Sequence, residues 1–508
     1  MKKYISIQRI ISCSFIALAM TAMTSCDDFL DEQPRGNAIA ETTDDYNAMF
    51  NATQFMNIAE PDYTKWLNPD ITHTVTTLQN LDTQAIYSMM GGASTYGFSS
   101  TNAYQLMTNP YADTENCDIW ADFYQRIYTY NVIANGVMGS RAGTDAQRRA
   151  LLAEARFSRA WMHFMLAQIF SKPYQLASDD DLTIPIVSQA NSMEKSFTRA
   201  TKKQLYDFIE SDLTESVEDL EDRPDHKMRV YKTTGYAMLG KYYWMTGQYE
   251  KALDPLRKAY DRLKNETDFH LINFNDYDVP NNPNVDLSNS NIHPNLINSP
   301  ELLWVKQNSG FLGAYMLGSY GPAYYISWDL YNLYDENDIR RNYVPTGAYV
   351  MSINWDTFEI VYVEQKYDGP VGCIRGNQDN YGVELADVYL GLAECEARVG
   401  NQANARNILR EFRSNRLATG HEEVPADVVS QNDLIVFCVD EQRREYVDHL
   451  NGYYNLRRLW NDPLFQNRKP YTRTDGERTY TFTEDNLYLR LPEGVLKWNE
   501  EWRTLITD

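Results

Sequence analysis

The sequence is poor in the residues that mark unusual protein classes. Its 508 residues include 25 glycines, 19 prolines and six cysteines, while 43% are hydrophobic. A chain of this length and composition buries enough apolar surface to fold without disulfides or a structural metal. Intrinsic disorder and a small disulfide-stapled scaffold are therefore excluded.

Positive charge is also scarce. The chain has 47 Lys and Arg against 70 Asp and Glu, for a formal net charge of −23. This charge repels nucleic-acid phosphates, and no cluster of basic residues offsets it. Beyond the N-terminus, no run approaches the roughly 18 apolar residues of a membrane span. We therefore expect no nucleic-acid partner and no transmembrane helix.

Catalytic and cofactor motifs are missing as well. The seven histidines form no HExxH pair, and no GxSxG, P-loop or GxGxxG motif follows a strand-like segment. His163 lies in an amphipathic stretch and is interpreted as a hydrogen-bonded histidine on a helix face. Asp179-Asp180-Asp181 is interpreted as a solvated loop, because a calcium site needs converging oxygens that a sequence cannot show. We predict no enzyme activity, no cofactor and no metal site.

The N-terminus carries a secretion signal. Basic residues precede an apolar run from Ile10 to Met23, which is too short to span a bilayer. The run ends in Met23-Thr24-Ser25-Cys26, which resembles a bacterial lipoprotein cleavage site with Cys26 as the lipidated residue. Residues 1–25 are therefore predicted to be removed, which takes the net charge to −26. Residues 26–508 are predicted to form one domain that contacts the membrane only through its lipid anchor.

Four cysteines remain after cleavage and lipidation, namely Cys117, Cys373, Cys395 and Cys438. They are far apart in sequence and form no CxxC pair, so the spacing of a zinc site is absent. We predict buried free thiols. The sequence leaves the possible disulfide pairings open.

A helical repeat is the clearest pattern in the chain. From Thr233 to Tyr260, apolar and small residues recur at three- and four-residue spacing on both sides of Gly247. This pattern is similar to a tetratricopeptide repeat, in which small residues let two antiparallel helices approach closely. A weaker copy spans Leu385 to Arg413, where Glu396 replaces an expected aromatic residue.

The predicted fold is predominantly α-helical, a scaffold of tetratricopeptide-like helix pairs with long irregular loops and short strands. Thr201 is a predicted N-cap, and Trp304, in a strand-like run, is assigned to packing. Long loops on a rigid scaffold are usually functional. The helix pairs are expected at about 120–170, 201–260, 385–413 and 433–460, the loop-rich insertions at about 57–116 and 268–380, and strand-like pieces at 302–306 and 358–365.

Further motifs are spread along the chain. Cys26 is followed by Asp28-Phe29-Leu30-Asp31 and Pro34. The other matching residues are Trp120, Tyr124, Ile127 and Asn131; Ala153 to Phe157 with Arg159, Ala160 and Pro185; Tyr331, Asp338, Arg340, Lys366 and Tyr367; Ala386 to Leu390 with Ala393 and Glu394; and Glu441, Arg444, Glu445 and Asn455 to Arg458. Together these motifs resemble the SusD/RagB family, surface nutrient-binding lipoproteins of the Bacteroidetes outer membrane.

Some positions depart from the pattern of that family. Glu384 and Gln442 stand where the family usually has Arg, and His449, Gly452 and Asn455 stand where Glu, Arg and Asp are common. Loss of one partner from a buried ion pair costs several kcal/mol, whereas loss of all partners together can be nearly neutral. The joint replacement indicates a divergent member, and ligand identity cannot be transferred from better-known relatives.

The aromatic surplus indicates where a ligand would bind. The chain has 37 Tyr and 10 Trp, and a sugar site needs flat aromatic platforms beside amides, carboxylates or guanidinium groups. The resemblance implies that the two loop-rich insertions meet on one face to form the glycan site. The candidate ligand residues are Tyr63, Trp66, Asn68, Tyr87, Tyr96 and Asn102 in the first insertion, with Tyr104 beside them, and Tyr315, Tyr320, Tyr324 and Trp328 in the second, with Tyr325 beside them.

The resemblance implies a cell-surface glycan-binding lipoprotein that delivers oligosaccharides or polysaccharides to a SusC-like TonB-dependent transporter. Acidic Asp27 and Asp28, directly after the lipidated cysteine, resemble a signal for display on the outer face of the outer membrane. A peptide-binding lid of a RagB-like importer is an alternative, for which the acidic charge would favour basic peptides. A surface glycosidase is a third alternative, although no acid and base pair is specified.

Overall fold

The computed structural model describes residues 40–505, apart from 52–54, 56, 59–65, 73–99, 112–117, 194–195, 224–225, 278–297, 309–324, 345, 355–356, 358, 367–368, 371–379, 448–450, 470 and 475–477. The predicted signal, Cys26, Cys117 and Cys373 lie outside the described residues. Their cleavage, lipidation and thiol state stay predictions.

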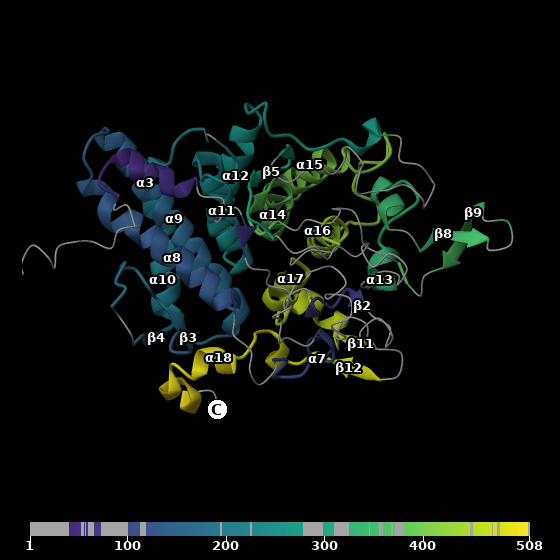
Figure 1. Ribbon diagram of the computed structural model, residues 1–508. Helices are drawn as coiled ribbons and strands as arrows, with labels where there is room; N and C mark the ends of the chain where they lie inside the picture. Colours follow the sequence, from purple (N-terminus) through teal and green to yellow (C-terminus); the bar gives the residue numbers. More distant parts are fainter. Residues whose placement is uncertain are drawn as a thin grey trace, which may run out of the picture.

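Helices dominate the described chain (Figure 1). They are α3 (Thr43–Phe50), α7 (Ser100–Tyr104), α8 (Asp118–Gly136), α9 (Asp145–Phe170), α10 (Lys202–Ser216), α11 (Lys232–Met245), α12 (Tyr249–Leu263), α13 (Trp328–Tyr331), α14 (Leu385–Arg398), α15 (Gln402–Arg413), α16 (Gln431–Glu445), α17 (Asn451–Leu459) and α18 (Glu493–Leu496).

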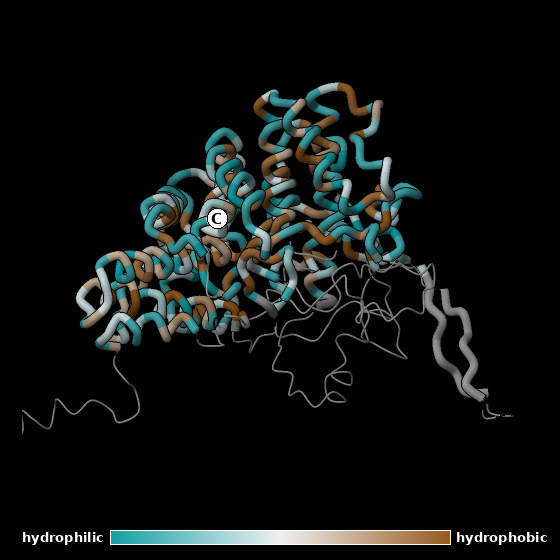
Figure 2. Tube along the Cα trace, turned by 90° about the horizontal axis from the view of Figure 1, so that it is seen from above, coloured by the Kyte–Doolittle hydropathy of each residue, from teal (hydrophilic) through white to brown (hydrophobic). Residues whose placement is uncertain are grey.

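The long helices pack in sequence order. Helix α9 packs against α8 and α10, α11 against α12, α12 against α14, and α14 against both α15 and α16. Seen from above, helices stand side by side, and hydrophilic and hydrophobic positions are interspersed along them (Figure 2). Amphipathic helices bury their apolar stripes in this kind of stack. The predicted helical scaffold with tetratricopeptide-like pairs, long loops and short strands is thereby confirmed.

Several helices begin at capping boxes. The backbone N–H of Gln204 donates to Thr201 Oγ1 at 3.2 Å, and the Gln204 side chain accepts from the Thr201 N–H at 3.0 Å. Thr144 and Ser430 start α9 and α16 in the same reciprocal way. Each box satisfies backbone donors that have no partner inside the helix. The predicted N-cap at Thr201 is confirmed.

The repeat at Thr233 to Tyr260 forms helices α11 and α12. Gly247 lies between them with φ +73°, a left-handed conformation that glycine adopts without strain. Gly240 faces Leu256 so closely that a Cβ there would lie 2.5 Å from Leu256 Cγ. The small residue therefore sets the helix separation, as the repeat pattern predicts.

Gly240→Ala should lower the free energy of unfolding by about 1–3 kcal/mol, because an added methyl overpacks this contact. The loss should outweigh the roughly 1 kcal/mol by which alanine favours a helix over glycine. Urea unfolding followed by circular dichroism measures the change. Gly139→Ala is the control, because a Cβ at Gly139 meets nothing within 4 Å and should leave the unfolding midpoint unchanged. Equal midpoints for both variants would contradict the prediction.

The weaker repeat copy forms α14 and α15, separated by Gly400 at φ +92°. Glu396, which stands where the pattern expects an aromatic residue, is buried on α14. Its carboxylate accepts from Arg257 Nε of α12 at 2.7 Å and from Asn401 Nδ2 at 2.7 Å. An ionic contact between neighbouring pairs thus replaces apolar packing, which is why the copy is hard to recognise.

The strands form two-stranded ribbons. They are β1 (Asn57–Ile58), β2 (Ile71–Thr72), β3 (Leu182–Pro185), β4 (Arg199–Thr201), β5 (Leu302–Trp304), β6 (Gln307–Asn308), β7 (Tyr325–Ile326), β8 (Gly347–Asn354), β9 (Glu359–Lys366), β10 (Val383–Glu384), β11 (Thr472–Thr474) and β12 (Thr479–Thr481). Parallel β1–β6 and antiparallel β2–β7 each join the two loop-rich insertions. The strand-like pieces expected at 302–306 and 358–365 correspond to β5 and β9.

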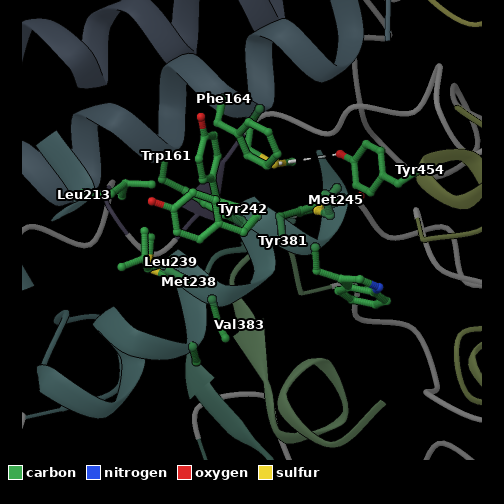
Figure 3. Close-up of a cluster of buried hydrophobic side chains, with 14 of the residues drawn as sticks. Trp161, Phe164, Leu213, Met238, Leu239, Tyr242, Met245, Tyr381, Val383 and Tyr454 are labelled. Carbon is green, nitrogen blue, oxygen red and sulfur yellow. Dashed lines mark hydrogen bonds between the residues drawn. The ribbon is translucent and has the colours of Figure 1, made fainter. Parts of the chain in front are cut away.

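The main core lies among the long helices. Figure 3 shows Trp161 and Phe164 of α9 facing Met238, Leu239 and Tyr242 of α11. Trp304 is fully buried and donates its indole N–H to the Met228 carbonyl at 2.9 Å, so its assignment to packing is confirmed. A second cluster, which includes Trp66, Ile71, Tyr325, Ile326 and Leu330, lies between the two insertions.

Cys395 and Cys438 are buried free thiols on α14 and α16, as predicted. Burial raises the pKa of both thiols well above the usual value. They are therefore inert packing residues. In the part of the chain that the structure describes, no helix is long and apolar enough to cross a membrane.

Candidate ligand-binding site

The two loop-rich insertions meet at the short ribbon β2–β7, where Ile71 pairs with Ile326 and Thr72 with Tyr325. Just before β2, the carbonyl of Asp70 accepts from the backbone N–H of Ser327 at 2.7 Å. This junction lies beside α16 and α17, on the side of the molecule where Figure 1 labels β2 and α13. The expectation that both insertions contribute to one face agrees with this arrangement.

Trp328 is the most exposed of the predicted ligand residues that the structure describes. It is the first residue of α13 and 50% exposed. Its ring packs edge-on against Tyr331, with centroids 5.4 Å apart and planes at 85°. The Arg341 guanidinium lies over the other ring of this pair, 5.2 Å from the Tyr331 centroid.

Polar groups surround this aromatic pair. Asp329 and Asn332 are exposed on the same short segment as Trp328, and Arg341 Nε donates to the Tyr331 hydroxyl at 3.4 Å. A flat ring beside a carboxylate, an amide and a guanidinium is the combination that binds the apolar face and hydroxyls of a sugar. We call Trp328, Tyr331 and Arg341 the α13 platform. Sequence reasoning missed Arg341 and treated Tyr331 only as a family motif, because nothing in the sequence places them beside Trp328.

Other candidate residues of the described chain are buried. Trp66 is only 7% exposed and belongs to the second core cluster, so it presents no open ring face. Asn68 is buried, and its side-chain oxygen accepts from the Asp70 backbone N–H at 2.9 Å. Tyr104 is fully buried and Tyr325 nearly so, while Asn102 is half-buried. As they lie here, Trp66, Asn68, Tyr104 and Tyr325 are packing residues, and their contact with a ligand stays a prediction.

The remaining candidates are Tyr63, Tyr87, Tyr96, Tyr315, Tyr320 and Tyr324. They lie outside the described residues, and their contact with a ligand stays a prediction.

A buried arginine holds the first insertion in place. Arg473 of β11 donates to the carbonyls of Trp66 and of Ala103, the latter at 3.1 Å, and lies 4.3 Å from the centre of the Tyr104 ring. Burial lowers the pKa of its guanidinium to about 9. Arg473 thus fastens two parts of the first insertion to the C-terminal ribbon.

A buried ionic network fastens the second insertion to the helical scaffold. Arg340 donates to both oxygens of Asp338 at 2.9 and 2.7 Å, to Glu441 at 2.5 Å and to Glu445 at 3.0 Å. Four arginines and four carboxylates balance the charge. The members are Arg340, Arg413, Arg416 and Arg444 with Asp338, Glu301, Glu441 and Glu445.

This network gives a physical role to residues that the sequence identified as family motifs. Asp338 and Arg340 come from the second insertion, whereas Glu441, Arg444 and Glu445 come from α16. Although burial opposes ionisation, the arginines around Glu441 hold the pKa of its carboxyl well below the usual value. The motif therefore fixes the segment that carries the α13 platform.

A second buried network surrounds Glu394 of α14. Its carboxylate accepts from Arg458 at 2.8 and 2.7 Å, from Arg398 at 2.7 Å, from Trp244 at 2.9 Å and from Gln442 at 2.8 Å. Helices α11, α14, α16 and α17 are joined at this one group. Despite burial, the two arginines hold the pKa of Glu394 far below the usual carboxyl value.

Direct contacts explain three of the departures from the family pattern. Asn455 Nδ2 donates to Gln442 Oε1 at 3.1 Å, so two amides pair where the family commonly has Arg and Asp. Gly452 leaves the space that the Asn68 side chain fills, since a Cβ at 452 would lie 2.3 Å from that amide. Gln442 and Asn455 thus form one pair of matched replacements. Glu384 is buried next to α14, and His449 lies outside the described residues.

The motifs of the first half of the chain are structural too. Arg159 forms a bidentate ion pair with Asp212, at 2.6 and 3.0 Å, and donates to the Asn131 side-chain oxygen at 3.0 Å. Glu154 accepts from Arg229 Nη2 at 2.7 Å, and Tyr124 donates to the Pro185 carbonyl at 2.9 Å. These contacts join α8, α9 and α10 to one another, to the strand that ends at Pro185 and to the segment that precedes α11. Within the described residues, no group of three or more His, Cys, Asp and Glu is arranged to hold a metal ion.

Comparison with known proteins identifies a family that the first half of the chain matches. Residues 28–244 match the SusD-like family described as "Starch-binding associating with outer membrane". No curated protein matches the sequence significantly.

Several solved structures share the fold. A SusD superfamily protein from Bacteroides thetaiotaomicron has a TM-score of 0.64 at 16% identity, covering 90% of this chain and 98% of that one. A surface glycan-binding protein A from Bacteroides uniformis has a TM-score of 0.60 at 16% identity, with coverage of 90% and 98%. A laminarin-binding SusD-like protein has a TM-score of 0.57 at 17% identity, again with coverage of 90% and 98%.

At these identities the structural matches show the fold, while the match over residues 28–244 concerns the sequence itself. Both agree with the motifs found along the chain. Residues 28–244 therefore match the SusD-like family in sequence, and the chain shares the fold of SusD-like structures over about nine tenths of its length.

Proposed function

We propose that the protein is a non-enzymatic, lipid-anchored glycan-binding protein of the cell surface, which captures oligosaccharides or polysaccharides for a SusC-like TonB-dependent transporter. The α13 platform is the observation that carries the binding part of this proposal. The match of residues 28–244 to a family described as starch-binding and associated with the outer membrane supports the location. The glycan-binding and laminarin-binding names of two structural neighbours support the ligand class.

The platform supports binding rather than catalysis. Trp328 and Tyr331 are held by a capped helix turn whose next segment is fastened through Arg340. A ligand that docks on such a preformed surface loses little free energy to reorganisation. The stacked helices offer a rigid body that a transporter can contact without disturbing this surface.

The function is tested by measuring binding of the purified protein to a panel of soluble polysaccharides and of mixed peptides by calorimetry. Saturable binding to at least one glycan supports the proposal. Binding to peptides alone would replace it with the peptide-importer alternative. Release of shorter sugars from a bound glycan would show that the protein is an enzyme.

Trp328→Ala should weaken binding of that glycan by about 1–3 kcal/mol, the usual cost of removing an aromatic contact residue. The helical content and the unfolding midpoint should stay unchanged, because Trp328 is half exposed. The matched control is Trp498→Ala, since Trp498 is 78% exposed near α18 and belongs to no aromatic pair with α13. Normal binding by Trp328→Ala, or equal losses in both variants, would show that the platform lies elsewhere.

A further inference from the structure

The carboxylate of Asp70 joins both insertions to the scaffold. Asp70 is buried in the first insertion, just before β2. Its Oδ1 accepts from the Ser327 hydroxyl at 3.0 Å and from Arg443 Nη2 at 2.6 Å, and its Oδ2 accepts from Arg443 Nε at 2.9 Å. The Asp70 carbonyl also accepts from the Ser327 backbone N–H. Asp70 therefore makes four hydrogen bonds, and these connect three segments that are distant in sequence.

Ser327 is the residue through which Asp70 acts on the platform. Its hydroxyl donates to Asp70 and accepts from the Leu330 backbone N–H at 3.1 Å, which makes it the N-cap of α13. Helix α13 has only four residues. So short a helix does not form by propensity alone, because nucleation is unfavourable. The direction of Trp328, the residue next to the cap, therefore depends on what holds Ser327.

Arg443 connects this contact to the scaffold. It lies on α16 and also donates to Asp440 at 3.3 Å, and Asp440 accepts from Arg468 at 2.7 Å. Burial opposes ionisation of Asp70, but the neighbouring guanidinium holds its pKa below the usual value. Asp70 is thus a charged acceptor at physiological pH, and charged acceptors make the stronger hydrogen bonds.

We propose that Asp70 is a positioning residue of the ligand site, which fixes Ser327 against Arg443 and thereby holds the Trp328 ring in its binding orientation. The proposal rests on the proposed function of the α13 platform. Asp70 itself does not contact the ligand. Its effect on binding passes entirely through Ser327 and α13.

The test compares variants that disrupt different contacts between Arg443, Asp70 and Ser327. Asp70→Asn keeps the shape but removes the charge that Arg443 and Ser327 share, and should weaken glycan binding about tenfold, the loss expected for one hydrogen bond to a charged group. Ser327→Ala leaves the pair of Asp70 and Arg443 intact and should weaken binding by a similar factor. In a Trp328→Ala background neither substitution should weaken binding further, because the ring that they orient is gone.

A spectroscopic measurement separates positioning from general loss of stability. With 5-fluorotryptophan incorporated, the ¹⁹F resonance of Trp328 is identified by its loss in Trp328→Phe. It should shift or broaden in Asp70→Asn and in Ser327→Ala. The matched control is Asp212→Asn, which weakens an equally close bidentate ion pair with Arg159 of α9, away from α13. This control should lower the unfolding midpoint and leave both the Trp328 resonance and glycan binding unchanged.

The outcomes are distinguishable from failure of the proposed function. If the wild-type protein binds no glycan, the function is wrong. If the wild-type protein binds, Trp328→Ala binds weakly, and Asp70→Asn and Ser327→Ala bind normally with an unchanged Trp328 resonance, the positioning role is overturned. Additive losses of Asp70→Asn and Trp328→Ala would also overturn it.

Discussion

Arg340→Ala should lower the free energy of unfolding by about 3–5 kcal/mol, the range measured when one partner of a buried ion pair is removed. Arg340 is fully buried and contacts Asp338, Glu441 and Glu445. Its removal leaves three carboxylates with less positive charge around them in a region that water does not reach. Urea unfolding of the two proteins at pH 7 measures the difference.

Two further variants give this prediction its control. Arg340→Lys keeps one positive charge but loses the planar fork that reaches several carboxylates at once, so its loss should be intermediate. Lys203→Ala removes an exposed contact with Asp207 within one helix, and should leave the unfolding midpoint unchanged. A midpoint for Arg340→Ala equal to that of wild type would show that the other arginines compensate fully.

Substitutions of Arg340 should also affect glycan binding, because its ionic network lies next to α13. Arg340 is nine residues from Tyr331, on the segment that leaves α13. If its buried contacts hold this segment to α16, destabilised Arg340 variants should lose glycan affinity before they lose their helices. The family motifs of this chain would then be explained by support of the site rather than by contact with ligand.

The scaffold could be predicted from the sequence because its signals are local. Helical spacing around Gly240 and Gly247, and the N-cap at Thr201, depend on residues only a few positions apart, and the structure confirms them. The motif residues were also recognised. Their partners were not, since Arg340 meets Glu441 across a sequence separation of 101 residues. Nothing in a single sequence specifies such a contact.

The ligand site was predicted less well for the same reason. Trp66 and Trp328 look alike in the sequence, because both are aromatic residues within polar, loop-rich segments. The structure separates them: Trp66 packs between the insertions, whereas Trp328 begins α13 and faces solvent. Asp70 carried no signal at all, since an acidic residue after Asn-Pro is typical of a turn. Its role depends on Ser327 and Arg443, which are distant in sequence.

His163 makes the stability of the folded chain depend on pH. The histidine is fully buried on α9. Its Nδ1 faces the Arg159 carbonyl at 2.8 Å, and its Nε2 accepts from the Val187 backbone N–H at 3.2 Å. Both contacts suit the neutral ring with its proton on Nδ1, which confirms the interpretation of a hydrogen-bonded histidine. Burial, reinforced by the positive charge of Arg159, lowers the pKa of His163 to about 4.

The stability that depends on His163 should fall as the pH is lowered from about 6.5 to about 4, by about 3 kcal/mol in total. Within this range the unfolded chain takes up a proton at the imidazole and the folded chain does not, so protonation favours unfolding. Above pH 6.5 the ring is neutral in both states and contributes no pH dependence. Urea unfolding of the wild type and of His163→Gln at pH 7 and pH 5 measures the effect.

The comparison isolates His163 because the other titrating groups are common to both proteins. Glutamine carries no titrating proton, and its amide can reach only part of the hydrogen bonding that the ring makes. His163→Gln should therefore be less stable than wild type at pH 7, but should lose less stability on going to pH 5, by about 2 kcal/mol. Equal losses in the two proteins would mean that His163 takes up its proton in the folded state as readily as in the unfolded one. In that case the Val187 N–H would have to give up its acceptor, and the segment after β3 would have to move away from α9.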